Sequence, residues 1–257
     1  MSLSVAASTQ PLAAETVFDL LEKVRGKAPR VHAITNSVAQ HFTANVLLAI
    51  GAIPSMTLAP EEVAGFAAGA DALLINLGTL DEVRRQAIPV AIAAARTAGR
   101  PVSIDPVFVE RSPVRCAYAR ELLSLKPDLV RLNEAEQSAL FDNRHAVESL
   151  INEGTVLAVT GEEDRIESKQ EDFRLRNGHP LMARVTATGC AGGAVLAAFA
   201  SVEPDMALAA AAGLSVFNIA GEMAASEARG PGSLVPELLD ALYTMTSRDI
   251  EVRLKSA

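Results

Sequence analysis

The sequence has 257 residues, of which 49% are hydrophobic and 4% aromatic, and its formal net charge is −8. A chain of this length can bury a sizeable core, and no stretch of it looks like a linker. We therefore expect one domain over residues 1–257, with residues 1–13 as a loose N-terminal arm. The negative charge opposes binding to phosphate backbones and anionic lipids, so neither nucleic acid nor a membrane is an expected partner.

The chain also carries signs of a cytoplasmic location. Its start has no basic segment followed by an apolar one, and no stretch reaches about 18 uninterrupted apolar residues. The two cysteines, Cys116 and Cys190, lack the spacing of metal ligands and fit a reducing compartment. The sequence leaves open a disulfide between them and gives Cys116 no role.

Short apolar runs alternate with helical patterns along the chain. Strands are expected at residues 31–34, 53–56, 72–76, 102–105, 129–132 and 156–160. Helices are expected at residues 11–25, 38–50, 81–98, 191–201, 204–228 and 234–247, with a hairpin over residues 165–177. Gly26 and Gly51 can end the first two helices, and Pro89 should kink or break the third. The alternation predicts an α/β fold with a mostly parallel sheet.

Polar residues follow three of the predicted strands. Asp105, Asn133 and Gly161 stand at carboxyl ends, which share one edge of a parallel sheet and form its usual ligand site. Asp105 and the Asn133-x-x-Glu136 pair could hold Mg²⁺ through waters. Asn133 is equally suited to cap a helix, and both roles are compatible.

A run of small residues at 185–193, Val-Thr-Ala-Thr-Gly-Cys-Ala-Gly-Gly, leads directly into an apolar helix. The free backbone N–H groups of such a turn favour an anion such as a phosphoryl group. A tight turn that only permits close helix packing is an equally good interpretation. Cys190 lies where a thiol pKa tends to fall, which would make it a base or acceptor, although the residues alone favour a buried structural cysteine.

Two further polar residues lie near predicted strand ends. Arg131 could clamp a phosphate, and Thr160 could bind a nucleotide. The alternatives are a surface arginine and ordinary turn chemistry. His32 and His41 have no metal-ligand spacing, so we expect structural roles for both.

Several motifs in order and spacing resemble the hydroxyethylthiazole kinase family, from about residue 32 to residue 242. They are residues 31–36 (VHAITN), 51–56 (GAIPSM), 75–80 (INLGTL), 105–107 (DPV), Arg131 with Asn133-x-x-Glu136, 159–162 (VTGE), 177–180 (NGHP), 185–190 (VTATGC) and 230–233 (GPGS). The resemblance implies a ribokinase-like three-layer sandwich, in which helices cover both faces of the sheet. It also implies a homotrimer with active sites between subunits.

The implied reaction is MgATP-dependent phosphorylation of the hydroxyl of 4-methyl-5-(2-hydroxyethyl)thiazole in thiamine biosynthesis. The resemblance then implies roles for nine residues. These residues are Asn36, Met56, Ala187 and Gly189 for the thiazole, Cys190 against its hydroxyl, Arg131 and Thr160 for ATP, and Asp105 and Glu136 for Mg²⁺.

The sequence departs from the family pattern near these residues. Phe108-Val109-Glu110-Arg111 replaces a glycine-rich stretch, while Leu132 and Ala187 each replace a glycine, and the segment after Glu136 is short. A left-handed backbone would cost alanine about 1 to 2 kcal/mol, so we expect either a shifted loop or no left-handed residue at position 187. The departures leave open another alcohol acceptor, an ATP-dependent dehydratase or a non-catalytic sensor of thiazole or nucleotide.

Overall fold

The computed structural model describes residues 8–256, and within them nine strands form one sheet in the order β1-β9-β8-β7-β6-β5-β4-β2-β3. The strands are β1 (Ser8–Thr9), β2 (Arg30–Ile34), β3 (Ile53–Ser55), β4 (Ala72–Asn76), β5 (Val102–Asp105), β6 (Leu129–Asn133), β7 (Val156–Thr160), β8 (Asp164–Glu167) and β9 (Glu171–Leu175). Strands β2 to β7 pair in parallel, whereas β8 and β9 add an antiparallel hairpin at one end.

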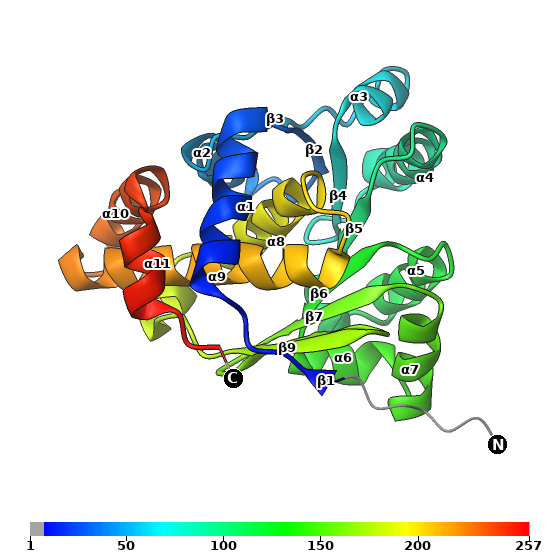
Figure 1. Ribbon diagram of the computed structural model, residues 1–257. Coiled ribbons are helices and arrows are strands. Elements are labelled where there is room, and N and C mark those ends of the chain that lie inside the picture. Colours follow the sequence, from blue (N-terminus) through cyan, green and yellow to red (C-terminus); the bar gives the residue numbers. More distant parts are fainter. Residues whose placement is uncertain (1–7, 257) are drawn as a thin grey trace.

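Helices cover both faces of this sheet (Figure 1). One layer contains α1 (Ala14–Lys27), α2 (Gln40–Ala49), α8 (Thr188–Ala200), α9 (Met206–Glu227), α10 (Pro231–Thr244) and α11 (Ser247–Arg253). The other contains α3 (Val63–Gly69), α4 (Glu82–Thr97), α5 (Pro113–Leu123), α6 (Glu134–Leu140) and α7 (Arg144–Asn152). The predicted mostly parallel, three-layer α/β sandwich is therefore confirmed.

Strand side chains alternate between two separate cores. In β4, Ala72 and Leu74 join the core under α8 and α9, while Leu73 and Ile75 join the core under α3 and α4. Successive residues of a strand point to opposite faces, so a strand buried on both faces needs a continuous apolar run. This explains why the central strands are mostly apolar before their carboxyl ends, with His32, Ser103 and Arg131 as the polar exceptions in the strand interiors.

The start of the described chain differs from the predicted loose arm. Residues 8–9 form β1, which pairs in parallel with β9 through Ser8 opposite Glu171. The amide of Leu12 also donates to Ser256 Oγ, 2.8 Å away, near the other terminus. The prediction was wrong for this part of the arm because long-range pairing with the hairpin orders it, and residues 1–7 lie outside the described residues.

The helix ends follow the sequence in some places only. Helix α1 buries the predicted face, but Gly26 lies inside it and Ala28, at φ 47°, ends it in a left-handed conformation. Gly51, at φ 90°, follows α2 as expected. Helix α4 continues through Pro89 instead of breaking there. The predicted last helix, at residues 234–247, corresponds to α10, which ends at Thr244, and α11 follows as a further helix that was not among the expected ones.

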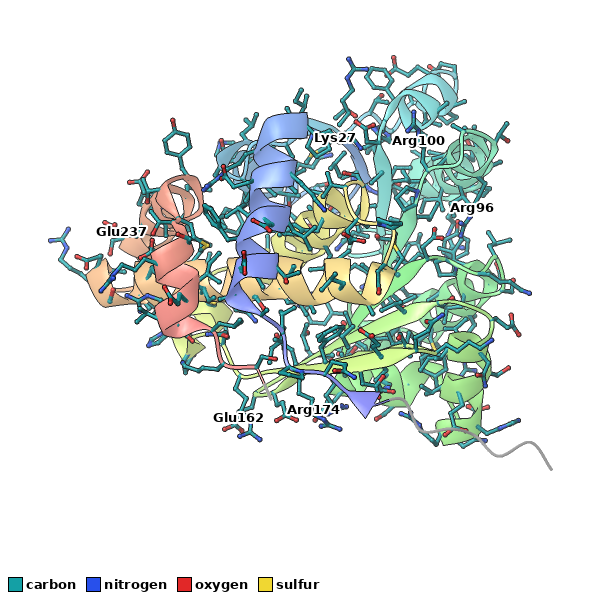
Figure 2. The ribbon with its side chains drawn as sticks, in the orientation of Figure 1. Lys27, Arg96, Arg100, Glu162, Arg174 and Glu237 are labelled. Carbon is teal, nitrogen blue, oxygen red and sulfur yellow. The ribbon has the colours of Figure 1, made fainter. Side chains whose placement is uncertain are left out.

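Most charged side chains lie on the outside of the molecule, whereas Arg84, Asp105, Glu136, Asp164 and Glu167 are buried. Figure 2 shows Lys27, Arg96 and Arg100 toward the amino ends of the strands, whereas Glu162 and Arg174 lie near the hairpin. At the amino ends, Asp71 Oδ1 lies 3.8 Å from Lys27 Nζ and 3.7 Å from Arg100 Nη1. The polar residues of the predicted site lie at the opposite edge of the sheet, at the carboxyl ends of the strands.

Helix α9 is, by length and composition, apolar enough to span a membrane, but 72% of its most apolar window is buried inside the protein. Its neighbours are α8 and α10, and its apolar residues belong to the core (Figure 1).

The two cysteines are free, since Cys190 lies at the start of α8 and Cys116 in α5 contacts the carbonyl of Ala139. The open possibility of a disulfide between them is therefore not realised.

Candidate active site

Four adjacent strands carry polar residues to one edge of the sheet. Asn76 at the end of β4 is in register with Asp105 at the end of β5, and Asn133 of β6 is in register with Thr160 of β7. Helix α8 begins above this edge and packs on β4 and β5. The sequence therefore predicted correctly that these strand ends would meet.

A continuous hydrogen-bonded chain connects Cys190 to Asp105. The side-chain amide of Asn36 donates to Cys190 Sγ and to Asn76 Oδ1, each 3.1 Å away, and the amide of Asn76 donates to Asp105 Oδ2 at 2.8 Å. All four side chains are buried. Gly78 leaves room for this chain, because a Cβ there would lie 2.7 Å from Asn36 Nδ2.

The guanidinium of Arg131 continues the chain toward β7. Its Nη2 donates to Thr160 Oγ1 at 3.1 Å, and its Nη1 lies 3.6 Å from Asp105 Oδ1. Its Nε is buried and has no hydrogen-bond partner within the described part of the chain. A buried donor of this kind is costly unless a ligand satisfies it.

The glycines at the start of α8 make room for this arginine. A Cβ on Gly189 would lie 3.2 Å from the Arg131 terminal nitrogens, and one on Gly193 would lie 3.3 Å from Asp105 Oδ2. Neither glycine has a positive φ, so space rather than backbone freedom is the reason for them. The first amides of α8 have no partner inside the helix and lie beside the guanidinium, which suits this corner to an anion.

Asp105 is buried, and burial raises its pKa to about 7, a rise that the nearby charge of Arg131 opposes and that of Glu136 reinforces. Its Oδ1 accepts no hydrogen bond from the described residues, although Arg131 lies nearby. One carboxylate oxygen is thus available to a cation or to a further donor.

Cys190 contradicts the expectation of a lowered pKa. The pKa of its thiol is raised to about 11, chiefly by burial and also by the charge of Asp105, and the hydrogen bonds from Asn76 and Asn36 only partly offset this rise. The stabilisation of a thiolate by the N-terminus of α8 is outweighed by the cost of burying its charge, because the side chain is only 8% exposed. At neutral pH Cys190 is therefore a protonated thiol, able to make a hydrogen bond but not to accept a proton.

Glu136 has a structural task that the sequence partly revealed. Its Oε2 accepts from the amide of Asn133 at 2.8 Å while Asn133 Oδ1 accepts from the amide of Glu136 at 2.9 Å, a capping box that starts α6. Its Oε1 accepts from the amide of Phe108 at 2.8 Å. Glu136 thereby fixes the turn after β5, where Val107 and Phe108 have φ values of 38° and 58°.

Ala187 is left-handed, with φ 68° and ψ 1°, and caps α8. Of the two expected alternatives, the absence of a left-handed residue at position 187 was wrong. The turn retains the shape that glycine would favour, because the next residue must begin the helix that carries Cys190. The protein tolerates a strain of about 1 to 2 kcal/mol here.

The other departures lie in different places. Leu132 is buried in the core under α5 and α6, because its neighbour Arg131 faces α8 and successive strand residues alternate. It therefore cannot narrow the site, contrary to the expected clustering of departures. Phe108 is 52% exposed, and the guanidinium carbon of Arg111 lies 5.3 Å from the centre of its ring.

Met56 and His32 lie toward the far end of the sheet. Met56 follows β3, the last strand in the order, and is separated from Asn76 and Asp105 by β2. His32 in β2 is fully buried, and its Nδ1 lies 2.8 Å from Ser55 Oγ. Burial lowers the pKa of His32 to about 4, so this histidine is neutral and structural, as expected.

A cavity of about 650 Å³ adjoins Arg131, Thr160 and Gly189. The rest of its wall comes from the β7–β8 turn, the start of β8, the segment before and within η2 (Pro180–Arg184), and helices α8 and α9. Of these, the Asn177-Gly178-His179-Pro180 segment was noted in the sequence. Asp164, Phe217 and Asn218 were missed, because no local pattern marks residues brought together by folding.

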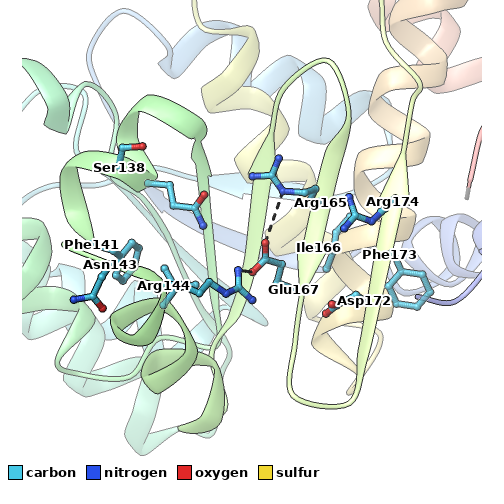
Figure 3. Close-up of a pocket in the computed structure, with 12 residues that line it drawn as sticks. Ser138, Phe141, Asn143, Arg144, Arg165, Ile166, Glu167, Asp172, Phe173 and Arg174 are labelled. Atoms are coloured by element: carbon cyan, nitrogen blue, oxygen red, sulfur yellow. Dashed lines mark hydrogen bonds and ion pairs between the residues drawn. The ribbon is translucent and has the colours of Figure 1, made fainter. Parts of the chain in front are cut away.

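A second cavity, of about 550 Å³, lies between α6, α7 and the β8–β9 hairpin (Figure 3). Arg144 and Arg165 both approach Glu167, with nitrogen to oxygen distances of 2.6 and 3.7 Å. Arg174 also lines this cavity and pairs with Glu163 at 2.8 Å. Each of these arginines is already neutralised by a carboxylate, so the cavity has the character of an ion-pair network.

Comparison with known proteins identifies the family. A family model described as the hydroxyethylthiazole kinase family matches residues 21–150 and 145–248. The chain is 45% identical to the hydroxyethylthiazole kinase of Granulibacter bethesdensis, covering 93% of this chain and 94% of that protein. It is 44% identical to a probable hydroxyethylthiazole kinase of Agrobacterium fabrum, covering 90% of this chain and 91% of that one.

Solved structures agree with this result. The hydroxyethylthiazole kinase protein from Pyrococcus horikoshii superposes with a TM-score of 0.88 at 36% identity, covering 95% of this chain and 98% of that one. A ribokinase-like superfamily protein from Enterococcus faecalis, at 14% identity and a TM-score of 0.64 over 90% of this chain and 94% of that one, shares the fold alone. The chain therefore belongs to the hydroxyethylthiazole kinase family, a family of phosphotransferases.

Proposed function

We propose that this protein transfers the γ-phosphoryl group of ATP to the hydroxyl of 4-methyl-5-(2-hydroxyethyl)thiazole, a step in thiamine biosynthesis. The observation that supports it most is the buried polar chain from Cys190 through Asn36, Asn76 and Asp105 toward Arg131. It joins a corner suited to an acceptor alcohol with a corner suited to phosphate. Phosphoryl transfer depends mainly on such positioning and on charge stabilisation.

The nucleotide would occupy the 650 Å³ cavity beside Arg131 and Thr160. Arg131 has an unpaired Nε and lies against the start of α8, so its guanidinium and the free amides there can both face the phosphate oxygens. Thr160 holds one terminal nitrogen of the guanidinium, which fixes its plane. These contacts favour the charge that develops on the transferred group.

The acceptor alcohol would lie near Asn36, Cys190 and Gly189, with Ala187 shaping the turn. Because the amide of Asn36 donates to Cys190 Sγ, the thiol hydrogen remains free to contact the acceptor hydroxyl. A thiol with a pKa of about 11 would orient that hydroxyl and keep its own proton. Direct transfer between two positioned oxygens requires no covalent enzyme intermediate.

The carboxylates fit Mg²⁺, which in this site would neutralise phosphate charge. Asp105 offers its unpartnered Oδ1, whereas both oxygens of Glu136 already accept backbone hydrogens and can reach an ion through water. The described residues contain no group of three or more histidine, cysteine or acidic side chains that could enclose a metal ion. Phosphate oxygens and waters would therefore supply most of its ligands.

Met56 supports a homotrimer in which neighbouring subunits complete each site. It follows the edge strand β3, and at this side of the protein Ile53 of β3 and Phe66 of α3 are 48% and 45% exposed. An apolar sheet edge of this kind favours association with another subunit. Met56 would then contact the thiazole bound at the site of a neighbour.

The choice of acceptor alcohol depends on the space in the site, and Phe108 and Ala187 replace residues that would leave more of it. Release of ADP should therefore be followed with hydroxyethylthiazole and with a panel of other thiazole and pyrimidine alcohols, each with and without Mg²⁺. Hydroxyethylthiazole is expected to support the highest kcat/KM. Higher turnover with another alcohol would reassign the acceptor, and no turnover with any alcohol would contradict the kinase proposal.

A further inference from the structure

Asp164 is a buried carboxylate that the roles proposed above do not use. It begins β8 directly after the β7–β8 turn, lines the nucleotide cavity and is 4% exposed. Its Oδ1 accepts from the backbone amide of Gly161 at 2.9 Å, and its Oδ2 accepts from the side-chain amide of Asn218 at 2.7 Å. It thus joins the turn to helix α9.

Keeping a carboxylate in this place has a cost. Burial raises the pKa of Asp164, and the amides of Gly161 and Asn218 and the charge of Arg131 oppose that rise. A buried charge loses its hydration, and this cost is tolerated only when hydrogen bonds or opposite charges compensate for it. The hydrogen bonds of Asp164 to Gly161 and Asn218 hold the turn that lines the cavity, so this carboxylate fixes the position of that part of the cavity wall.

The β7–β8 turn directly follows Thr160, the residue whose hydroxyl binds the guanidinium of Arg131. Thr160 Oγ1 accepts from Arg131 Nη2 at 3.1 Å, and Gly161 is the next residue. Holding the amide of Gly161 therefore fixes where the hydroxyl of Thr160 stands. The other terminal nitrogen of Arg131 is only loosely paired, 3.6 Å from Asp105, so Thr160 provides the tighter restraint on the guanidinium.

We propose that Asp164 and Asn218 form a positioning pair for the nucleotide site, holding the Thr160–Gly161 turn so that the Arg131 guanidinium faces the phosphates. This inference rests on the proposed use of the cavity for ATP. The pair acts through Arg131 rather than on the nucleotide itself. Its loss should weaken nucleotide binding and leave the acceptor site unchanged.

Four variants separate this role from a general effect on stability. Asp164→Ala removes the link, and Asn218→Asp places two carboxylates against each other. The exchange variant Asp164→Asn with Asn218→Asp restores both hydrogen bonds, because the new amide can face the new carboxylate while its oxygen accepts from Gly161. Asp128→Asn is the matched control, since Asp128 accepts the amide of Val102 at 2.7 Å at the opposite edge of the sheet.

Binding of MgADP by calorimetry is the readout, together with thermal melting and the KM values for ATP and for the acceptor. Asp164→Ala and Asn218→Asp should weaken MgADP binding about tenfold, with the KM for the acceptor unchanged, and the exchange variant should recover to within about threefold of wild type. Asp128→Asn should leave MgADP binding unchanged. In an Arg131→Ala background, Asp164→Ala should weaken binding by less than about twofold.

An equal loss in both backgrounds, or an exchange variant as weak as Asn218→Asp, would overturn the positioning role. Because the exchange variant keeps the paired geometry, the test survives even if Asp164→Ala fails to fold. A wild-type protein that binds MgADP but does not phosphorylate hydroxyethylthiazole would overturn the proposed acceptor and leave the inference on Asp164 standing. A wild-type protein that does not bind MgADP would overturn both.

Discussion

His32 should make the protein sensitive to mild acid. Its imidazole is fully buried in β2, its Nε2 has no hydrogen-bond partner among the described residues, and burial lowers its pKa from 6.5 to about 4. Between these two values the unfolded chain binds more protons than the folded protein. The free energy of unfolding therefore rises with pH in that range, and the stability is lost as the pH falls through about 6.5 toward 4.

The size of the effect follows from the two pKa values. At pH 7.5 His32 is deprotonated in both states, whereas at pH 4.5 it is almost fully protonated when unfolded and about a quarter protonated when folded. Moving from pH 7.5 to pH 4.5 should thus remove about 2.5 kcal/mol of stability through this residue alone. Because β2 leads to Asn36, and the hydroxyl of Ser55 beside His32 belongs to the strand before Met56, acceptor binding by the folded protein should weaken only as the pH falls toward about 4, where the folded-state His32 becomes protonated.

Urea unfolding at both pH values and at one fixed protein concentration measures this contribution. The His32→Phe variant should lose about 2.5 kcal/mol less than wild type between the two pH values, whatever its stability at pH 7.5. His145→Gln is the control, because that histidine is exposed on α7. Equal pH dependence in wild type and His32→Phe would refute the reasoning, since it would mean that the buried imidazole does not resist protonation.

Substitutions at three positions test individual side chains of the site. Ala187→Gly should raise the free energy of unfolding by roughly 0.5 to 1 kcal/mol, since φ 68° suits glycine. The same substitution should raise kcat/KM for hydroxyethylthiazole by about tenfold. A lower free energy of unfolding would show that the turn is unstrained. Arg131→Ala should raise the KM for ATP through the loss of charge-assisted bonds worth roughly 1.5 to 3 kcal/mol, and an unchanged KM would remove its role. Cys190→Ala should lower kcat by roughly 100-fold without abolishing it. Cys190→Ser should keep the wild-type pH profile of kcat between about pH 6 and 9, since a thiol with a pKa of about 11 does not titrate there. A limb of that profile that vanishes in the serine variant would identify Cys190 as a base.

Much of the sheet edge could be predicted from the sequence because its signals are local. Apolar runs that end in Asp105 and Asn133 identify buried strands and their carboxyl ends, and the Asn133-x-x-Glu136 spacing is itself a helix start. The hairpin after β7 was recognisable from its alternation. These features depend on neighbours within a few residues.

The rest of the site depends on residues far apart in the chain. The raised pKa of Cys190 comes from burial and from Asp105, and its partner Asn36 stands 154 residues earlier, so the helix start alone gave the wrong direction. The glycines of α8 could be assigned to the space that Arg131 occupies only after folding brought the two together. Helices α3 and α5 were missed as well, because their apolar patterns are short or weak.

The most direct test of the proposed reaction follows phosphorus by ³¹P NMR in a mixture of purified protein, ATP, Mg²⁺ and hydroxyethylthiazole. The γ-phosphoryl signal of ATP should decrease as a phosphate monoester of the thiazole alcohol and ADP appear in equal amounts, and Asp105→Ala and Arg131→Ala should slow this conversion. Persistence of ATP, or formation of inorganic phosphate without the thiazole monoester, would contradict it.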